Sequence, residues 1–165
     1  MGVETRDHLI AATNILFGVA NFLILPLPKA WRFGREICPP EVDSNTRRGN
    51  SLWVTSGRTS HIIYNEERRA GLELVVSVSK GKAKGFKPKV RELIAQGLIR
   101  AGGHEATYLL GRVKRGLFTK KMVETLQLSF YCDRTGRTIT LKLTGSCAEE
   151  DLQQILEAIP KLECH

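Results

Sequence analysis

The stretch from Val123 to Ile159 constrains the fold of this chain more than any other. Apolar side chains recur at every second position in two runs, which are Leu126, Leu128, Phe130 and Cys132, then Ile139, Leu141 and Leu143. This period is typical of strands with one buried face. Asp133 and Gly136 lie between the runs and favour a tight turn, because Asp bonds nearby backbone and Gly adopts positive φ. The stretch therefore predicts a β-hairpin.

A helix is expected directly after this hairpin. Ser146 and Glu149 have the spacing of a capping box, in which both side chains bond free amides at a helix start. One apolar stripe at helical spacing follows, consisting of Leu152, Ile155, Leu156 and Ile159. Pro160 then ends the helix. The stretch thus predicts a strand-strand-helix unit.

A similar unit is expected earlier in the chain. Ile63 and Leu72 match Phe130 and Ile139 in an alignment of the two strand regions. A helix is expected from Pro88, a favourable first residue, to Ala101. The match lies in the pattern with few identities, so an internal repeat and a coincidence of two ordinary units both remain open.

These expectations define an α+β fold, with a mostly antiparallel sheet of about six strands and two helices on one face. The sheet and helices are expected to come from the two strand-strand-helix units, with an additional apolar helix at the N-terminus. Three regions follow from composition: an apolar segment at 1–28, a linker rich in Pro and polar residues at 29–50, and the α+β domain at 51–165. The first strand of that domain is expected at Leu52–Val54.

The apolar segment has two interpretations. No charged residue occurs from Leu9 to Leu25, and this length is near the lower limit of about 17 residues for a membrane-spanning helix. Asn14 and Asn21 weaken the case for a membrane span, and the segment also fits a buried or docking helix, which we prefer. If the segment inserts, Lys29 and the arginines after it hold the main domain on the cytoplasmic side. We therefore expect a cytoplasmic protein or one held at a membrane, with residues 9–25 as a contact to membrane or partner.

The four cysteines show no paired C-x-x-C spacing. Cys132 is expected to be a buried small apolar residue, and Cys147, near a helix start, is a candidate for a lowered thiol pKa. Cys164 and His165 are suitable metal ligands, but they have no second feature in support. We expect reduced thiols, no metal site and no cofactor.

The charge balance favours polyanionic partners. The chain has 25 lysines and arginines against 17 acidic residues, a net charge of +8 and a pI near 9.6. Such an excess attracts nucleic acid or anionic lipid, although it does not determine the fold.

One basic run lies where the first helix is expected to begin, and it comprises Lys80, Lys82, Lys84, Lys87, Lys89 and Arg91. Cations at a helix N-terminus oppose the helix dipole, so a bound anion would explain them. The second expected helix begins instead with Glu149, Glu150 and Asp151, as a helix without an anion should. The spacing of Gly81 and Gly85 is not that of a nucleotide-binding P-loop.

A second basic run precedes the hairpin, and it comprises Arg112, Lys114, Arg115, Lys120 and Lys121. Aromatic residues occur near both runs, namely Phe86, Tyr108, Phe118 and Tyr131. Cations with aromatics can follow a phosphodiester backbone and stack bases, so we expect both runs to contact nucleic acid, RNA in preference to DNA. Lysine-rich loops are also common as solvated surface, and edge strands carry lysine against aggregation.

The leading hypothesis is therefore a non-enzymatic binding protein that grips a polyanion with a basic loop and strand. One alternative is an interaction or assembly subunit held at a membrane by its apolar N-terminus. Another is a small enzyme acting on a phosphorylated substrate, although His8, His61 and His104 have no partner at catalytic spacing and no catalytic residue is assigned. The oligomeric state does not follow from the sequence.

Overall fold

The computed structural model describes residues 2–14, 16, 18–34, 39, 41–42, 56–118 and 120–165. These residues form nine strands, one α-helix and one 3₁₀ turn: β1 (Thr5–Asn14), β2 (Gly18–Pro28), β3 (Arg32–Phe33), β4 (Gly57–Asn65), β5 (Ala70–Lys80), β6 (Glu92–Ala101), β7 (His104–Arg115), β8 (Lys121–Cys132), β9 (Arg137–Ser146), α2 (Glu149–Ala158) and η1 (Ile159–Lys161). The strand expected at 52–54 and much of the expected linker lie outside the described residues.

Seven of the strands form one antiparallel sheet in the order β3-β4-β5-β9-β8-β7-β6. The predicted hairpin is present as β8 and β9, with Leu128 opposite Leu141 and Gly136 at positive φ in the turn. β1 and β2 form a separate two-stranded antiparallel sheet. The mostly antiparallel sheet expected from the alternating patterns is thus confirmed.

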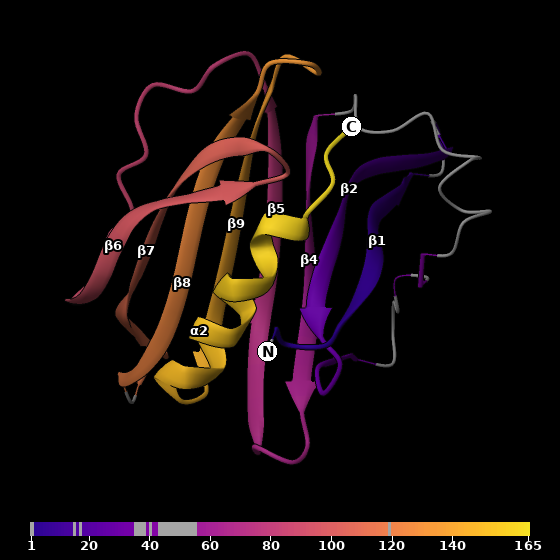
Figure 1. Cartoon of the computed structure of the whole chain (residues 1–165). Coiled ribbons are helices and arrows are strands. Elements are labelled where there is room, and N and C mark those ends of the chain that lie inside the picture. Colours follow the sequence, from indigo (N-terminus) through magenta and orange to yellow (C-terminus); the bar gives the residue numbers. More distant parts are fainter. Residues whose placement is uncertain are drawn as a thin grey trace.

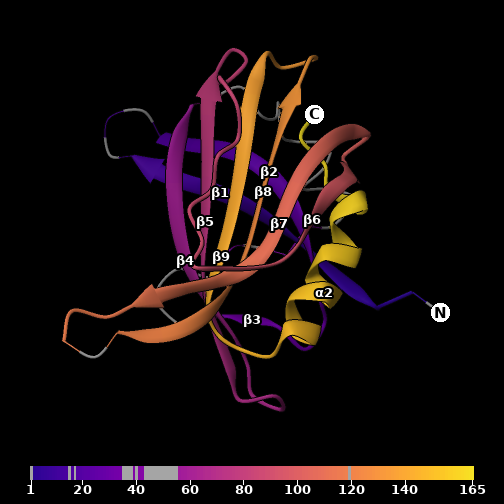
Figure 2. The same ribbon diagram turned by 90° about the vertical axis from the view of Figure 1, so that its left-hand side faces the viewer.

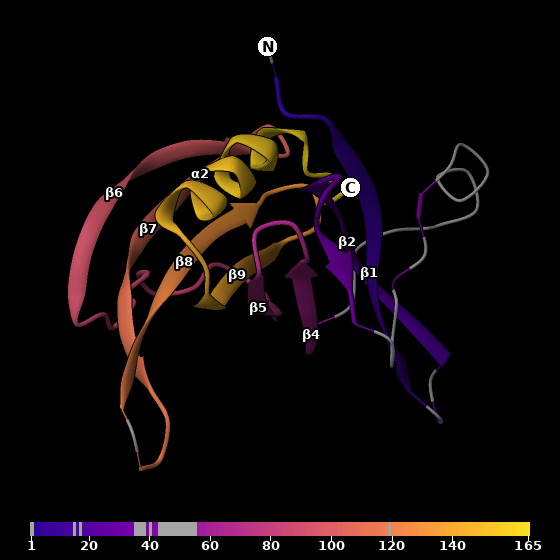
Figure 3. The same cartoon turned by 90° about the horizontal axis from the view of Figure 1, so that it is seen from below.

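The sheet curls around a single core that α2 and the β1–β2 hairpin close on one side (Figures 1 and 3). Leu126 and Leu141 from the sheet are fully buried, together with Leu23 from β2 and Ile155 from α2. The N-terminal hairpin therefore packs on the same core as the large sheet.

The expected N-terminal apolar helix is wrong, because residues 5–28 form the β1–β2 hairpin. Every residue from Phe22 to Pro28 is buried, so β2 has no polar alternation that would distinguish it from a buried helix. Asn14 and Gly18 flank the reversal of the chain, where residues of these types favour a turn. No helix among the described residues is long and apolar enough to cross a membrane.

The expected first helix is also wrong, so the sheet does not carry two helices on one face. Residues 92–101 form β6, the edge strand next to β7. Gly97, which disfavours a helix, lies opposite Tyr108, and a Cβ at this position would be 3.2 Å from the Tyr108 ring. Because the first unit ends in a strand, the chain is not built from two strand-strand-helix units.

α2 is the one α-helix of the described chain and occupies the position predicted for the second helix. Its cap differs from the predicted one, since the helix begins after Ala148 instead of Ser146. The buried Asp151 carboxylate accepts a hydrogen bond from the Ala148 amide at 2.9 Å and another from Arg68 Nε at 2.8 Å. An acidic side chain near a helix N-terminus also complements the helix dipole.

Candidate nucleic-acid interface

The residues between β5 and β6, which we name the crossover (residues 81–91), run across the face of the sheet that points away from the core. The Gly81 amide donates to Gly136 O at 2.8 Å, and the Thr138 hydroxyl donates to Gly81 O at 2.8 Å. At the other end, the Arg91 amide donates to Arg112 O at 2.9 Å. Thr138 alternates with the buried Ile139, so its side chain lies on the outer face. The crossover is therefore attached to the sheet at both of its ends, and Thr138 holds its first residue on the outer face.

The cations of the first basic run are exposed along and beside the crossover, and they comprise Lys80, Lys82, Lys84, Lys87, Lys89 and Arg91. Within the described chain, none of these six side chains has a carboxylate at ion-pair distance. Unpaired cations that lie close together produce a positive potential that attracts anions. The helix-dipole argument for an anion here fails, because no helix follows the crossover, but the concentration of charge remains.

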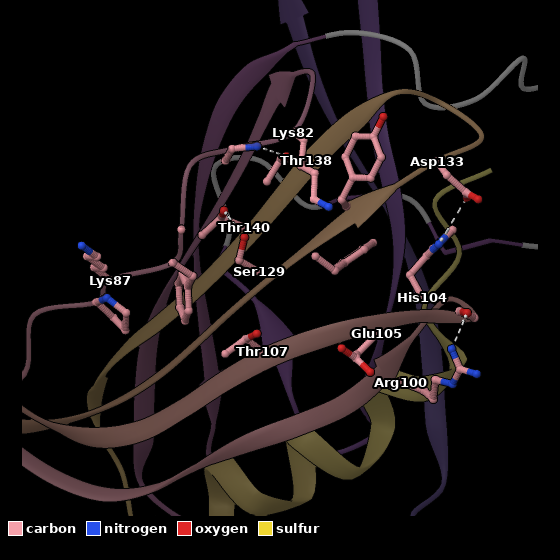
Figure 4. A pocket seen from close by; sticks show the side chains of 17 residues that line it. Lys82, Lys87, Arg100, His104, Glu105, Thr107, Ser129, Asp133, Thr138 and Thr140 are labelled. Atoms are coloured by element: carbon pink, nitrogen blue, oxygen red, sulfur yellow. Dashed lines mark hydrogen bonds and ion pairs between the residues drawn. The ribbon is translucent and has the colours of Figure 1, made fainter.

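A cleft of about 700 Å³ lies between the crossover and the outer face of β7, β8 and β9 (Figure 4). Lys82 and Lys87 from the crossover and Arg100 from β6 line it. The aromatic side chains that line it are Phe86 and Tyr131. This combination provides both phosphate-binding cations and faces on which bases can stack.

Hydroxyl groups also line this cleft, and they belong to Thr107, Ser129, Thr138 and Thr140. Ser129 Oγ and Thr140 Oγ1 are 3.2 Å apart, close enough for one hydrogen bond between them. Glu105 and Asp133 are acidic members of the same lining. The cleft is therefore polar, with cations concentrated along the crossover side.

The structure brings parts of the two basic runs together at Lys89 and Lys114. Both side chains line a hollow of about 270 Å³ together with Arg91 and Lys120. They also line a second hollow of about 320 Å³, in which the remaining cations are Arg58, Arg115 and Lys142. The basic surface thus continues from the cleft past the crossover toward the β7–β8 end of the sheet.

Arg112 does not belong to this surface. It alternates in phase with Ala106 and Leu110, which are buried in the core, so it lies on the opposite face of the sheet. Its Nε donates to Glu124 at 2.7 Å and its Nη1 is 3.4 Å from Glu92, and these carboxylates raise the pKa of Arg112. Arg112 therefore stays protonated, and the carboxylates of Glu92 and Glu124 balance its positive charge.

Arg115 is on the outer face but is also paired, since it contacts Glu73 and donates to Thr144 O at 3.2 Å. Lys80, Lys84 and Lys121 are exposed but line none of these three hollows.

Sequence reasoning missed three cations that line the hollows, which are Arg58, Arg100 and Lys142. For Lys142 the sequence does contain a signal, because it alternates with the apolar Leu141 and Leu143 and therefore lies on the outer face.

The β7–β8 hairpin projects beyond the body of the molecule (Figure 2). Leu117 is 93% exposed and Phe118 is fully exposed. Lys114, Lys120 and Lys121 flank them in sequence and are exposed. We name residues 114–118 and 120–122 the hairpin tip.

The thiol pKa of Cys147 differs from the sequence-based expectation. Burial raises the pKa of the Cys147 thiol to about 12, and the nearby carboxylates of Asp151 and Glu124 add to this effect. Cys147 is thus a weak nucleophile at neutral pH, in contrast to the lowered pKa expected from its place near a helix start.

No protein-family model matches the sequence, and no curated protein has significant sequence similarity to it.

Proposed function

We propose that the outer face of the sheet binds single-stranded nucleic acid, RNA in preference to DNA, without sequence-specific readout. The observation that supports this function is the set of unpaired cations on the crossover above a cleft that also contains Phe86 and Tyr131. Proteins that bind single strands combine a positive groove for the backbone with aromatic side chains for the bases.

The extent of the surface supports a polymer over a small phosphorylated substrate. Lys82 and Lys87 line the cleft, whereas Lys89 and Lys114 line the next hollows along the same face. A single phosphate would be held by cations that converge on one point, but these cations are spread along the sheet. Several successive phosphates would meet them in turn.

The hydroxyl groups of the cleft support RNA over DNA. Ser129 and Thr140 present hydroxyls that both donate and accept hydrogen bonds. The ribose 2′-OH is the group that distinguishes RNA from DNA, and hydroxyl side chains are suitable partners for it.

The test compares two triple variants of the whole chain that remove equal charge. The first is Lys82→Ala, Lys87→Ala and Lys89→Ala on the crossover, and the control is Arg6→Ala, Lys29→Ala and Lys161→Ala on β1, the β2–β3 turn and η1. We expect the crossover variant to bind labelled single-stranded RNA at least about ten-fold more weakly, with a log-log salt slope shallower by about 2. The control variant should bind nearly as the wild type does.

Equal weakening in both variants would show that net charge attracts RNA without a defined site. Unchanged affinity in the crossover variant would remove the crossover from the binding surface. Circular dichroism and thermal unfolding of both variants would confirm that each retains the fold.

The hairpin tip favours a second candidate function, which is binding to an anionic membrane surface. Exposed Leu117 and Phe118 beside lysines have the composition of a segment that enters the interfacial region of a bilayer. Leu117→Ser with Phe118→Ser should reduce sedimentation with phosphatidylserine vesicles several-fold and leave RNA affinity unchanged. Vesicle binding that the two substitutions do not alter would exclude this role for the tip.

A further inference from the structure

Four potential metal ligands that are far apart in the sequence meet at one end of the core. His104 is the first residue of β7, Cys132 is the last residue of β8, and Cys164 and His165 end the chain. Their ligand atoms all lie within 4.8 Å of one another. Cys132 and Cys164 are buried, whereas His165 is exposed. Two sulfurs and two imidazoles therefore face a common point.

The spacing of these atoms fits a tetrahedral zinc ion. His165 Nδ1 is 3.4 Å from Cys164 Sγ and 3.6 Å from Cys132 Sγ. In a tetrahedral site with Zn–S near 2.3 Å and Zn–N near 2.0 Å, a sulfur and a nitrogen ligand are about 3.6 Å apart. Both sulfur–nitrogen distances are within about 0.2 Å of that value.

His104 is oriented to provide the fourth ligand. Its Nδ1 pairs with Asp133 Oδ1 at 3.6 Å (Figure 4). Its Nε2 is buried and has no hydrogen-bond partner among the described residues. A buried polar atom without a partner is costly unless another group satisfies it. Metal-binding histidines commonly donate their other ring nitrogen to a carboxylate, which fixes the tautomer and orientation. The His104 ring also stacks on Phe130 at 5.9 Å.

The backbone around the cluster holds the C-terminal segment in place. The Ile24 amide donates to Glu163 O at 2.9 Å, and the Glu163 amide donates to Ile24 O at 3.1 Å. On the other side, Gly102 lies against the same segment, because a Cβ at this position would be 2.8 Å from Leu162 O. Cys164 and His165 are thus positioned by the fold.

We propose that Cys132, Cys164, His104 and His165 bind one Zn²⁺, with Nε2 of His104 as its ligand atom. On binding, the two thiols lose their protons to solvent, and two thiolates with two neutral imidazoles complete a complex of zero net charge. Four protein ligands leave no open position for substrate, which is typical of a structural site. The ion would join the start of β7 and the end of β8 to the end of the chain.

The first test is the metal content and coordination of the purified whole chain. We expect one zinc per chain by mass spectrometry, and tetrahedral ligand-field bands with thiolate charge transfer after replacement by Co²⁺. Zinc well below one equivalent after reduction and reconstitution, or octahedral cobalt, would overturn the proposal. A Cys132–Cys164 disulfide in a protein that takes up no zinc even after reduction would also overturn it.

Variants then assign the ligands. His165→Gln changes an exposed side chain and Cys164→Ser changes one sulfur, and each should weaken zinc affinity by at least about 100-fold. Asp133→Asn, which changes the carboxylate partner of His104 and none of the four ligands, should weaken zinc affinity by about 10- to 100-fold. The matched control Cys147→Ser, outside the cluster, should bind zinc as the wild type does. Wild-type affinity in His165→Gln would overturn the assignment, and this variant should fold because its side chain is exposed.

Discussion

His8 is a buried titratable residue whose two ring nitrogens both lack a hydrogen-bond partner in the described chain. Its ring lies 4.8 Å from the Phe33 ring. Burial lowers the pKa of His8, and this effect exceeds the opposing effects of Glu41 and Asp7. The neutral imidazole is therefore the form that the folded protein accommodates.

This residue predicts a loss of stability in mild acid. Below the unfolded pKa of about 6.5, the unfolded chain binds a proton at His8 that the folded chain resists, so the free energy of unfolding decreases as the pH falls. His8→Phe keeps an aromatic ring against Phe33 but removes the titration. In urea unfolding at pH 7.5 and 5.5, we expect the wild type to lose more stability than the variant. Equal losses would contradict the role of His8.

At the scale of single residues, the sequence predicted which side chains are exposed. It did not predict which side chains distant in the sequence contact one another. The crossover lysines were expected at the surface and are exposed there. Cys164 and His165 were recognised as possible ligands, but nothing in their spacing pointed to Cys132 or His104. Those contacts depend on how β7, β8 and the C-terminal segment come together, which local sequence does not encode.

Among the elements, β8, β9 and α2 could be predicted from sequence, whereas β2 and β6 could not. β8 and β9 alternate clearly because one face is buried. β2 is covered on both faces, and a continuous apolar run has no strand period. In β6, the register shift between Leu93 and Ala95 breaks the alternation, so apolar residues fall at spacings that resemble a helix.

The position of β2 in the core predicts a large cost for truncating its side chains. Leu23 is fully buried in β2, and Leu98 is 64% exposed in β6. Leu23→Ala should lower the free energy of unfolding by about 3 kcal/mol, because it removes buried apolar contacts and leaves a cavity. The same change at Leu98 should cost less than about 0.5 kcal/mol. Guanidinium unfolding compares the two, and a similar small effect at both sites would mean that the hairpin is not part of the core.

On the scale of the whole molecule, the basic surface results from topology. β5 and β6 are separated in the sheet by β9, β8 and β7, so the chain between them must cross a face of the sheet. The core, α2 and the β1–β2 hairpin lie on one face, and the crossover lies on the other. The sequence indicated a basic segment, but only the strand order places its lysines above a cleft and next to Lys114 and Lys142.

The measurement that tests the proposed function most directly is the affinity of the whole chain for a labelled single-stranded RNA at several salt concentrations. The unpaired cations of the crossover should displace several counterions from the RNA. We therefore expect binding at low salt and a log-log slope of about −3 or steeper, which corresponds to four or more phosphates at roughly −0.7 each. Absence of binding at low salt, or an affinity that does not change with salt, would contradict the proposal that the outer face binds nucleic acid.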